Sequence, residues 1–223
     1  MKKLLIPLLL ILPLHAYAEN NIYVEGQLNY NNPKDVSTKE LSGVGETGIT
    51  YSNVKIENKY DSETDAGIEI GLANIADTNF RAGLSYTKTS FKLDRSTLSG
   101  SVTRGVTTVT GGVDITPADW ASVGITFDND VKLYMANAYY DFEINENFKP
   151  FVGLGMGMAD IENAKDKEFT YSGAVGARYF FNEKVYLGGK FAYTVINGPE
   201  DDFGLTYDDI DLYTTSLILG YEF

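Results

Sequence analysis

Apolar and polar residues alternate along eight separate segments of this chain. Successive side chains of an extended strand point to opposite faces, so each segment has one apolar face and one polar or small face. This period of two predicts β-strands that lie between an apolar medium and a polar interior. The predicted strands span approximately residues 21–31, 65–75, 80–87, 131–142, 150–158, 169–179, 185–195 and 212–223.

The last segment shows the alternation to its final residue. One face carries Tyr213, Leu217, Leu219, Tyr221 and Phe223. The other face carries Thr214, Ser216, Gly220 and Glu222, with Ile218 as an apolar member. A terminal strand with an exposed aromatic end favours lipid over water as its surroundings.

The connections between the strands are of two kinds. Short polar turns lie near residues 76–79, 145–147 and 182–184, whereas long polar segments lie at about 32–64 and 92–130, with shorter ones near 160–168 and 197–210. This asymmetry is typical of the periplasmic and extracellular ends of a membrane barrel. Residues 106–109 are β-prone and could extend neighbouring strands above the membrane. If they formed a membrane hairpin, the barrel would have ten strands, because bacterial single-chain barrels keep an even number.

The first 18 residues match a secretory signal. Lys2 and Lys3 precede an apolar run from Leu4 to Leu14, and Ala16-Tyr17-Ala18 forms a small-residue cleavage site. We therefore expect residues 1–18 to be a signal peptide and residues 19–223 to be one domain. No later run reaches the roughly 20 apolar residues of a spanning helix, so strands must cross any membrane.

Charge and composition narrow the partners. Loss of Lys2 and Lys3 lowers the formal charge from −13 to −15, which argues against nucleic acid as a partner. The chain has no Cys and therefore no disulfide, and its one His, His15, lies in the signal peptide. Zinc is not expected, because its usual nitrogen and sulfur ligands are missing from the mature chain. No cofactor is predicted.

Two features resemble bacterial outer-membrane β-barrel proteins. The last strand resembles the C-terminal strand of that family, which ends in Phe with apolar residues two, four and six places earlier, here Tyr221, Leu219 and Leu217. The run 137–142 followed by 149–157 resembles the N-x-Y-Y-D … P-Y-V-G-x-G-x-G hairpin of its small porin-like, surface-antigen branch, with Phe151 in place of Tyr. The resemblance implies an eight-stranded antiparallel up-and-down barrel in a Gram-negative outer membrane. It also implies that Leu217, Leu219, Tyr221 and Phe223 are read by the barrel-assembly machinery.

The predicted inner face of this barrel is charged. A barrel of eight strands is only wide enough to be filled by side chains or to hold one small ligand. Buried charges are tolerated only when paired, so we expect an ion-pair network that plugs the barrel, with a gated narrow ion path as the alternative. The members of this network are Glu25, Glu69, Arg81, Asp141, Arg178, Lys190 and Glu222.

Catalysis is not expected. Outer-membrane enzymes of this barrel type, such as lipid A acyltransferases and omptin-type proteases, resemble one another in needing a His as general base. A mature chain without His or Cys lacks that base and a thiol nucleophile. An enzyme that uses carboxylates alone remains a third alternative.

Two acidic clusters and one Trp are the remaining candidates. Oxygen ligands at the spacing of 61–65 and of 200–211 suit Ca²⁺, but the EF-hand pattern fails, so solvated loop charge is the preferred interpretation. Trp120 follows Thr116 as N-cap and Pro117 as first helical residue, which predicts a short helix. Trp120 either anchors a protein partner or packs onto the barrel rim or the interfacial headgroups.

The leading hypothesis is a monomeric barrel in outer-membrane lipid whose loops serve adhesion, antigenic display or envelope integrity. The loops would then meet a host or other extracellular ligand. The alternative is a transport protein, either a narrow pore or a barrel that holds a small apolar ligand.

Overall fold

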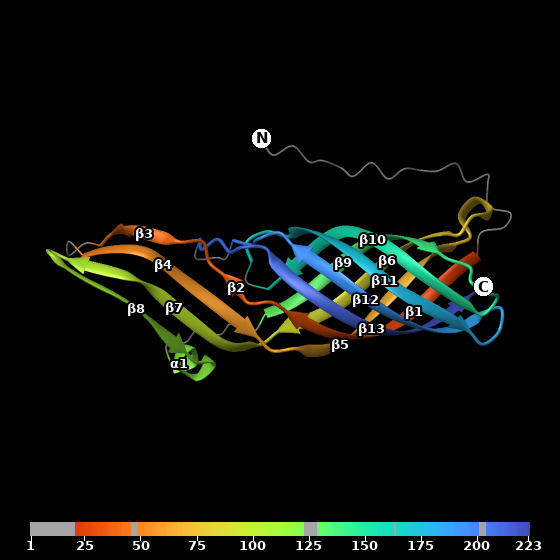
Figure 1. Ribbon diagram of the computed structural model, residues 1–223, viewed down its shortest axis with the longest axis horizontal. Coiled ribbons are helices and arrows are strands. Elements are labelled where there is room, and N and C mark those ends of the chain that lie inside the picture. Colours follow the sequence, from red (N-terminus) through yellow and green to blue (C-terminus); the bar gives the residue numbers. More distant parts are fainter. Residues whose placement is uncertain (1–20, 46–48, 123–128, 163, 201–203) are drawn as a thin grey trace.

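Eight antiparallel strands close into a barrel in the computed structural model, which describes residues 21–45, 49–122, 129–162, 164–200 and 204–223. The strand order around the barrel is β1-β13-β12-β11-β10-β9-β6-β5, and β5 pairs with β1 to complete the ring (Figure 1). The predicted eight-stranded antiparallel barrel is therefore confirmed. Its strands are β1 (Asn21–Pro33), β5 (Glu63–Ala73), β6 (Phe80–Phe91), β9 (Asn129–Asp141), β10 (Phe148–Ile161), β11 (Glu168–Phe180), β12 (Val185–Ile196) and β13 (Ile210–Glu222).

The first and last strands form the seam of the ring. Val24 pairs with Tyr221 and Leu28 pairs with Leu217. The backbone N–H of Phe223 donates to the carbonyl of Ile22 at 2.9 Å. Closure satisfies backbone groups that an open edge would leave unpaired in lipid, where each would cost several kcal/mol.

One end of the barrel, called here the turn end, carries three short connections. The first contains the 3₁₀-helix η1 (Ile75–Asp77). In the other two, the side chains of Asn145 and Asn182 accept hydrogen bonds from backbone N–H groups two and three residues later, at 2.8–3.0 Å. Asn favours tight turns for this reason. The opposite end, the loop end, carries the longer connections.

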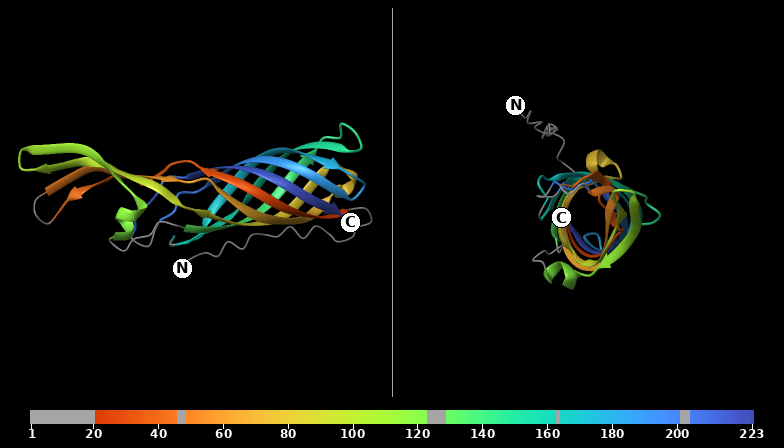
Figure 2. Two further views of the ribbon diagram at one scale, coloured as in Figure 1. Left: turned by 90° about the horizontal axis from the view of Figure 1, so that it is seen from below. Right: turned by 90° about the vertical axis from the view of Figure 1, so that its left-hand side faces the viewer.

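A second antiparallel sheet, called here the projecting sheet, extends from the loop end along the barrel's long axis (Figure 2). It contains β2 (Val36–Ser37), β3 (Leu41–Val44), β4 (Ile49–Tyr60), β7 (Leu93–Arg104) and β8 (Thr107–Ile115), and α1 (Pro117–Ser122) follows β8. Because β7 pairs with β4 and with β8, and neither β7 nor β8 pairs with a barrel strand, the ten-stranded alternative is wrong.

The long segment at 32–64 has more regular structure than its sequence pattern suggested. β4 continues into β5 and β6 continues into β7, so the same two stretches of chain pair inside the barrel and again outside it. Outside the barrel both sheet faces meet solvent, which removes the alternation that reveals a strand. A register shift between Ser52 and Lys55, with Asn53 at φ 53°, interrupts the pattern further.

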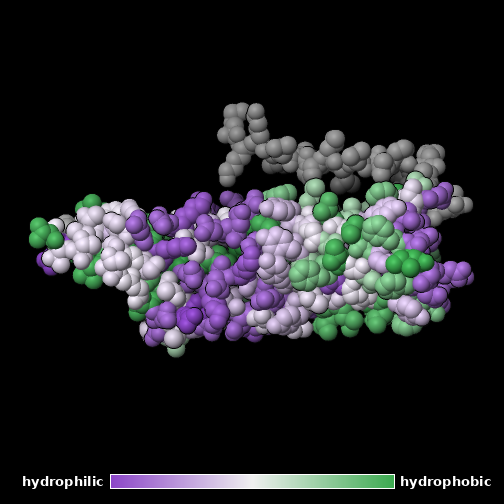
Figure 3. All heavy atoms as spheres, viewed as in Figure 1, coloured by the Kyte–Doolittle hydropathy of each residue, from purple (hydrophilic) through white to green (hydrophobic). Residues whose placement is uncertain are grey.

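The outer surface of the barrel is apolar and is bounded by aromatic side chains. Ile70, Leu84 and Leu154 are more than half exposed, as lipid-facing residues of a barrel are, and Figure 3 shows such side chains gathered over the barrel. Aromatic pairs near the turn end include Phe80–Tyr140 and Tyr221–Phe223, and pairs near the loop end include Tyr86–Tyr134 and Phe169–Tyr171. Two such girdles mark the interfaces of a membrane barrel. In the described part of the chain, no helix has the length and apolar character needed to cross a membrane.

Candidate functional site

A chain of ion pairs fills the barrel near its turn end. Arg81 binds Glu25 at 2.9 Å and Asp141 at 3.1 Å, and all three side chains are at least nine-tenths buried. Arg178 binds the same Oδ2 of Asp141 at 2.7 Å and binds Glu222 at 2.6 Å. These five residues come from β1, β6, β9, β11 and β13, so the network joins strands all around the ring.

Glu69 lies beside this network and is held by uncharged donors. Its carboxylate accepts hydrogen bonds from the hydroxyls of Tyr23 at 2.5 Å and Tyr139 at 2.9 Å, and from the side-chain amide of Asn137 at 3.0 Å. The guanidinium of Arg81 lies 5.0 Å from the ring centroid of Tyr23 and 4.3 Å from that of Tyr139. The two phenol rings therefore contact both the carboxylate and the arginine, which distributes the buried charge over neutral neighbours.

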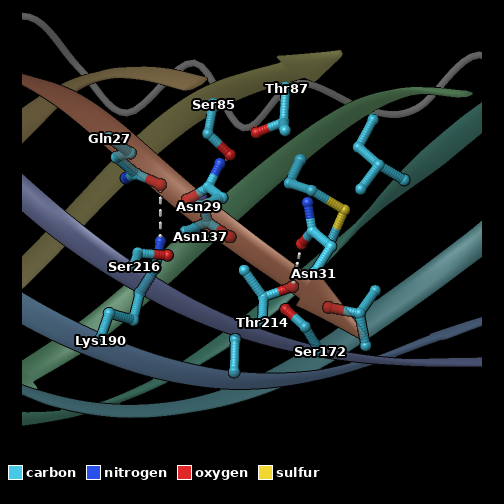
Figure 4. Close-up of a pocket in the computed structure, with 14 residues that line it drawn as sticks. Gln27, Asn29, Asn31, Ser85, Thr87, Asn137, Ser172, Lys190, Thr214 and Ser216 are labelled. Atoms are coloured by element: carbon cyan, nitrogen blue, oxygen red, sulfur yellow. Dashed lines mark hydrogen bonds between the residues drawn. The ribbon is translucent and has the colours of Figure 1, made fainter. Parts of the chain in front are cut away.

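Lys190 is separate from the carboxylates. Its Nζ donates to Oε1 of Gln27 at 2.9 Å, and no ion pair joins it to an acid among the described residues. Lys190 and Gln27 belong to the wall of a polar chamber of about 70 Å³ in the middle of the barrel (Figure 4). The wall is lined mainly by amides and hydroxyls: Gln27, Asn29, Asn31, Ser85, Thr87, Asn137, Ser172, Lys190, Thr194, Thr214 and Ser216.

Apolar side chains gather in the barrel mouth at the loop end. This mouth cluster consists of Val36, Phe91, Val131, Leu133, Ala159, Ile161, Ile196, Ile210 and Leu212, each less than a tenth exposed. Tyr60 packs on the cluster, with its ring centroid 5.7 Å from that of Phe91, and burial raises the pKa of Tyr60 to about 12. The interior thus changes from charged to polar to apolar along the barrel axis.

The structure brings six of the seven predicted interior residues close together. Glu25, Arg81, Asp141, Arg178 and Glu222 form the ion-pair chain, and Glu69 joins it through Tyr23 and Tyr139. Lys190 lies apart, in the chamber wall. Among the described residues, Glu222 forms its ion pair with Arg178 and not with Arg81.

Four residues that hydrogen-bond to this network were not among its predicted members. Tyr186 donates to Glu25 at 2.8 Å, and Tyr23, Tyr139 and Asn137 hold Glu69. Each of them is a bulky polar residue on the inner face of a strand near glycines, and this pattern could have indicated that they belong to the network. The mouth cluster had no such signal, because most of its members lie at strand ends and could face either way.

The predicted helix around Trp120 is present as α1. The N–H and hydroxyl of Thr116 donate to Asp119 at 2.9 and 2.6 Å, and this lowers the pKa of that carboxyl. The indole N–H of Trp120 donates to the hydroxyl of Ser96 at 3.1 Å, so the partly buried side chain packs on β7 of the projecting sheet, not on the barrel rim. Its role as an anchor for a protein partner stays a prediction.

The acidic clusters are mostly occupied by ordinary partners. Glu63 pairs with Lys92 at 2.7 Å, Glu200 with Lys165 at 2.9 Å, and Asp211 with Lys34 at 2.9 Å. Asp65 accepts from the amides of Asn29 and Asn31. Across the described ranges, no group of three or more acidic or His side chains is arranged to hold a metal ion. Asp201 and Asp202 lie outside the described residues, as do residues 1–18, for which a signal peptide stays a prediction.

Comparisons with known proteins agree with the fold. PagN, an outer membrane protein of Salmonella typhimurium, is 28% identical to this chain over 108 residues, which cover 40% of this chain and 45% of PagN. The match therefore spans less than half of that relative. The crystal structure of Neisserial surface protein A covers 91% of this chain and 97% of its own, with a TM-score of 0.52 and 14% identity. The solid-state NMR structure of outer membrane protein AlkL covers 91% and 90%, with a TM-score of 0.50 and 16% identity.

The family assignment rests on a longer match. The model of the outer membrane protein beta-barrel domain matches residues 4–223, which include all eight barrel strands and the projecting sheet. The chain belongs to the outer membrane protein β-barrel domain family, and it is a β-barrel of the Gram-negative outer membrane.

Proposed function

We propose that this protein is a closed outer-membrane anchor that presents the projecting sheet at the cell exterior as a binding surface for adhesion. The observation that carries the proposal is the sheet itself. Residues 36–45, 49–60 and 93–122, which include segments far apart in sequence, form one antiparallel sheet with a helix at its side. Disordered loops would lose conformational entropy on binding, whereas a folded sheet is already ordered for a partner.

The exposure of the sheet supports this role. Among its apolar side chains, Val44 is 72% exposed, Val109 66% and Val102 48%. These residues lie outside the barrel, so lipid does not cover them. Val102 lies directly opposite Val109 on β8 and Tyr51 on β4, so exposed side chains of three neighbouring strands form one row. A contiguous exposed apolar patch of this kind supports a protein-binding surface.

The barrel interior supports an anchor over a channel. The ion-pair chain occupies the turn end and the mouth cluster occupies the loop end. Ions would have to displace paired, buried charges at one end and cross an apolar constriction at the other, and both steps are costly.

We also propose that the protein is not an enzyme, although proteases share the barrel fold. The interior carboxylates Glu25, Asp141 and Glu222 are each paired with arginine, and Glu69 is held by three donors. No pair of carboxylates stands ready as acid and base among the described residues, and the mature chain offers no His or Cys to replace them.

A sheet-trimmed variant tests the proposal. Residues 36–60 and 93–128 are replaced by short Gly-Ser turns, which leaves all eight barrel strands intact. Bacteria that display the full chain are expected to bind cultured epithelial cells and immobilised matrix proteins. The trimmed variant should bind roughly tenfold less, a loss of ~1.4 kcal/mol. Equal binding by both, at equal surface amounts of folded barrel, would contradict the proposal.

One observation favours a second candidate, a narrow channel. The polar chamber in the middle of the barrel, with Lys190 in its wall, is a space that hydrated ions or a small polar solute could enter. Rearrangement of the mouth cluster would have to open it. Conductance measurements on the refolded protein in a planar bilayer decide between the two candidates.

A further inference from the structure

Strand β8 forms an open edge of the projecting sheet. In the described part of the chain it pairs only with β7, from Thr107 opposite Arg104 to Ile115 opposite Ser96. Eight of its nine residues are exposed. Its outer edge therefore presents a row of backbone N–H and C=O groups to solvent, which is a template for another strand.

This edge lacks the usual protection against pairing. Natural edge strands are commonly blocked by Lys, Pro or a bulge. The sequence of β8 is Thr-Thr-Val-Thr-Gly-Gly-Val-Asp-Ile, with neither Lys nor Pro, and its pairing with β7 runs without a register shift. Val109 and Val113 are 66% and 54% exposed and lie on one face, since they are four residues apart.

The sequence of β8 is complementary to itself. In an antiparallel pair of two copies centred on Gly111, Val109 of each copy would face Val113 of the other. Thr108 would face Asp114, and Gly111 would face its own counterpart on the two-fold axis. Opposed Val side chains stabilise antiparallel strands, and an interface in which each copy uses the same patch is the commonest form of protein dimer.

The charge on this edge does not oppose such pairing. Asp114, the one charged residue of β8, accepts a hydrogen bond from Thr97 at 2.8 Å and lies 3.8 Å from Arg95, both in its own chain. In the self-complementary register the two Asp114 side chains lie at opposite ends of the paired segment. Like charges are therefore not placed opposite each other.

The direction of β8 determines where the second copy would be. The strand runs from the far tip of the projecting sheet back toward the barrel, roughly along the long axis of the molecule (Figures 1 and 2). An antiparallel partner strand runs the other way, so its barrel points in the opposite direction. Two copies joined in this way cannot share one membrane side by side, but they can span two facing membranes.

We propose that β8 is a homotypic adhesion strand, which pairs antiparallel with β8 of a second copy displayed on another cell. This proposal rests on the proposed function and names the partner of the same projecting sheet. It agrees with a monomeric barrel within each membrane.

A single cysteine on the two-fold axis tests the proposal. The chain has no Cys, Gly111 does not have a positive φ, and a Cβ built at Gly111 meets no atom within 4 Å. Opposed residues of an antiparallel pair have Cα atoms about 4.5–5.5 Å apart, within the range of a disulfide. Two bacterial strains would each display Gly111→Cys with a different N-terminal epitope tag after the signal segment. Mild oxidation of the mixed strains should yield a disulfide-linked dimer that carries both tags.

The matched control is Thr107→Cys, on the same face and strand. In the proposed register the two thiols introduced by this substitution would lie roughly 26 Å apart, at about 3.3 Å per residue over eight residues, so no dimer is expected. The absence of a mixed-tag dimer from Gly111→Cys would overturn the proposal. Equal amounts of mixed-tag dimer from the two Cys variants would overturn it too. A cross-link from Gly111→Cys to a different protein would assign the edge to another partner and would also overturn it.

A charge exchange tests the register without oxidation. Cells that display Val109→Lys/Val113→Lys should not clump with themselves, and neither should cells with Val109→Glu/Val113→Glu, whereas a mixture of the two should clump. Leu41→Lys, at an exposed apolar residue of β3 on the other side of the same sheet, should clump like the unaltered protein. One outcome separates this proposal from the proposed function. If neither the unaltered cells nor any variant clumps, the homotypic strand is refuted. If the sheet-trimmed variant still loses epithelial binding in that case, the proposed function stands.

Discussion

Arg178 and Glu222 form an ion pair of 2.6 Å across the inside of the barrel. Glu222 is the last residue of β13, which closes the ring against β1, and Arg178 lies on β11, two strands away. The penultimate residue of the chain is thus fixed from inside, while Phe223 beside it is 65% exposed on the outer surface. Closure of the barrel and completion of its charge network occur at the same residues.

Asp141 is predicted to be the most sensitive member of this network. Its Oδ2 contacts both Arg81 and Arg178, so Asp141→Asn leaves two buried guanidinium groups short of a counter-charge. Removal of one partner from a buried ion pair typically costs about 3–5 kcal/mol. Urea unfolding of the barrel in lipid vesicles should show a loss of this size. Asp130→Asn, which breaks the exposed pair with Lys88, should cost no more than about 1 kcal/mol.

Gly220 provides the space in which Tyr186 reaches Glu25. A Cβ at Gly220 would overlap the Tyr186 ring, whose hydroxyl donates to Glu25 at 2.8 Å. We expect Gly220→Val to displace that ring and to destabilise the barrel by about 1–3 kcal/mol, the usual cost of overpacking. Gly26→Val, on the outer face where a Cβ meets no atom within 4 Å, is the control and should be tolerated. Similar unfolding midpoints for both variants would contradict this account of Gly220.

Deletion of Phe223 is predicted to reduce assembly and not binding. The deletion removes the hydrogen bond from Phe223 N–H to Ile22 and the last aromatic side chain of the seam. The amount of heat-modifiable, folded barrel at the cell surface should fall. The control is Phe181→Ala, because Phe181 is 60% exposed near the same end of the barrel but is not part of the seam. Equal surface amounts of the two variants would show that the terminal residue has no special role.

The helix beside the projecting sheet should loosen in acid. The Thr116 hydrogen bonds lower the pKa of Asp119 in the folded protein, so their contribution to stability is complete above the ordinary carboxyl pKa of about 3.9. It is lost as the pH falls from there through the lowered pKa. Trp120 is the only Trp and lies in this helix, so its fluorescence should change in that pH range. Asp119→Asn should remove the pH dependence, and an unchanged titration in that variant would contradict the assignment.

The barrel could be predicted from the sequence because lipid imposes a period of two on every spanning strand. The alternation at Leu217, Leu219 and Tyr221 is required by apolar surroundings on one side and a polar interior on the other. The inner face followed from the same pattern, and this is why Glu25, Arg81 and Arg178 could be placed together.

The projecting sheet could not be predicted in the same way. Residues 49–57 of β4 have no buried face, so no alternation is selected there. The alternation predicted that Lys190 faces the barrel interior but not how far it lies from each carboxylate. That distance depends on the tilt and stagger of the strands. The hydrogen bonds from Tyr23 and Tyr139 to Glu69 depend on side-chain rotamers, which cannot be predicted from sequence periodicity.

Single-channel recording on the refolded protein in a planar bilayer tests the central claim most directly. The ion-pair chain and the mouth cluster are two barriers to ions, so we expect no reproducible conductance steps from the full chain. We expect none from Lys190→Met either, because this substitution alters the chamber wall and leaves both barriers in place. Asp141→Asn, which weakens one barrier, should still be silent because the mouth cluster remains. Uniform steps from the full chain, altered in size by Lys190→Met, would contradict a closed anchor and would make the chamber part of a conducting path.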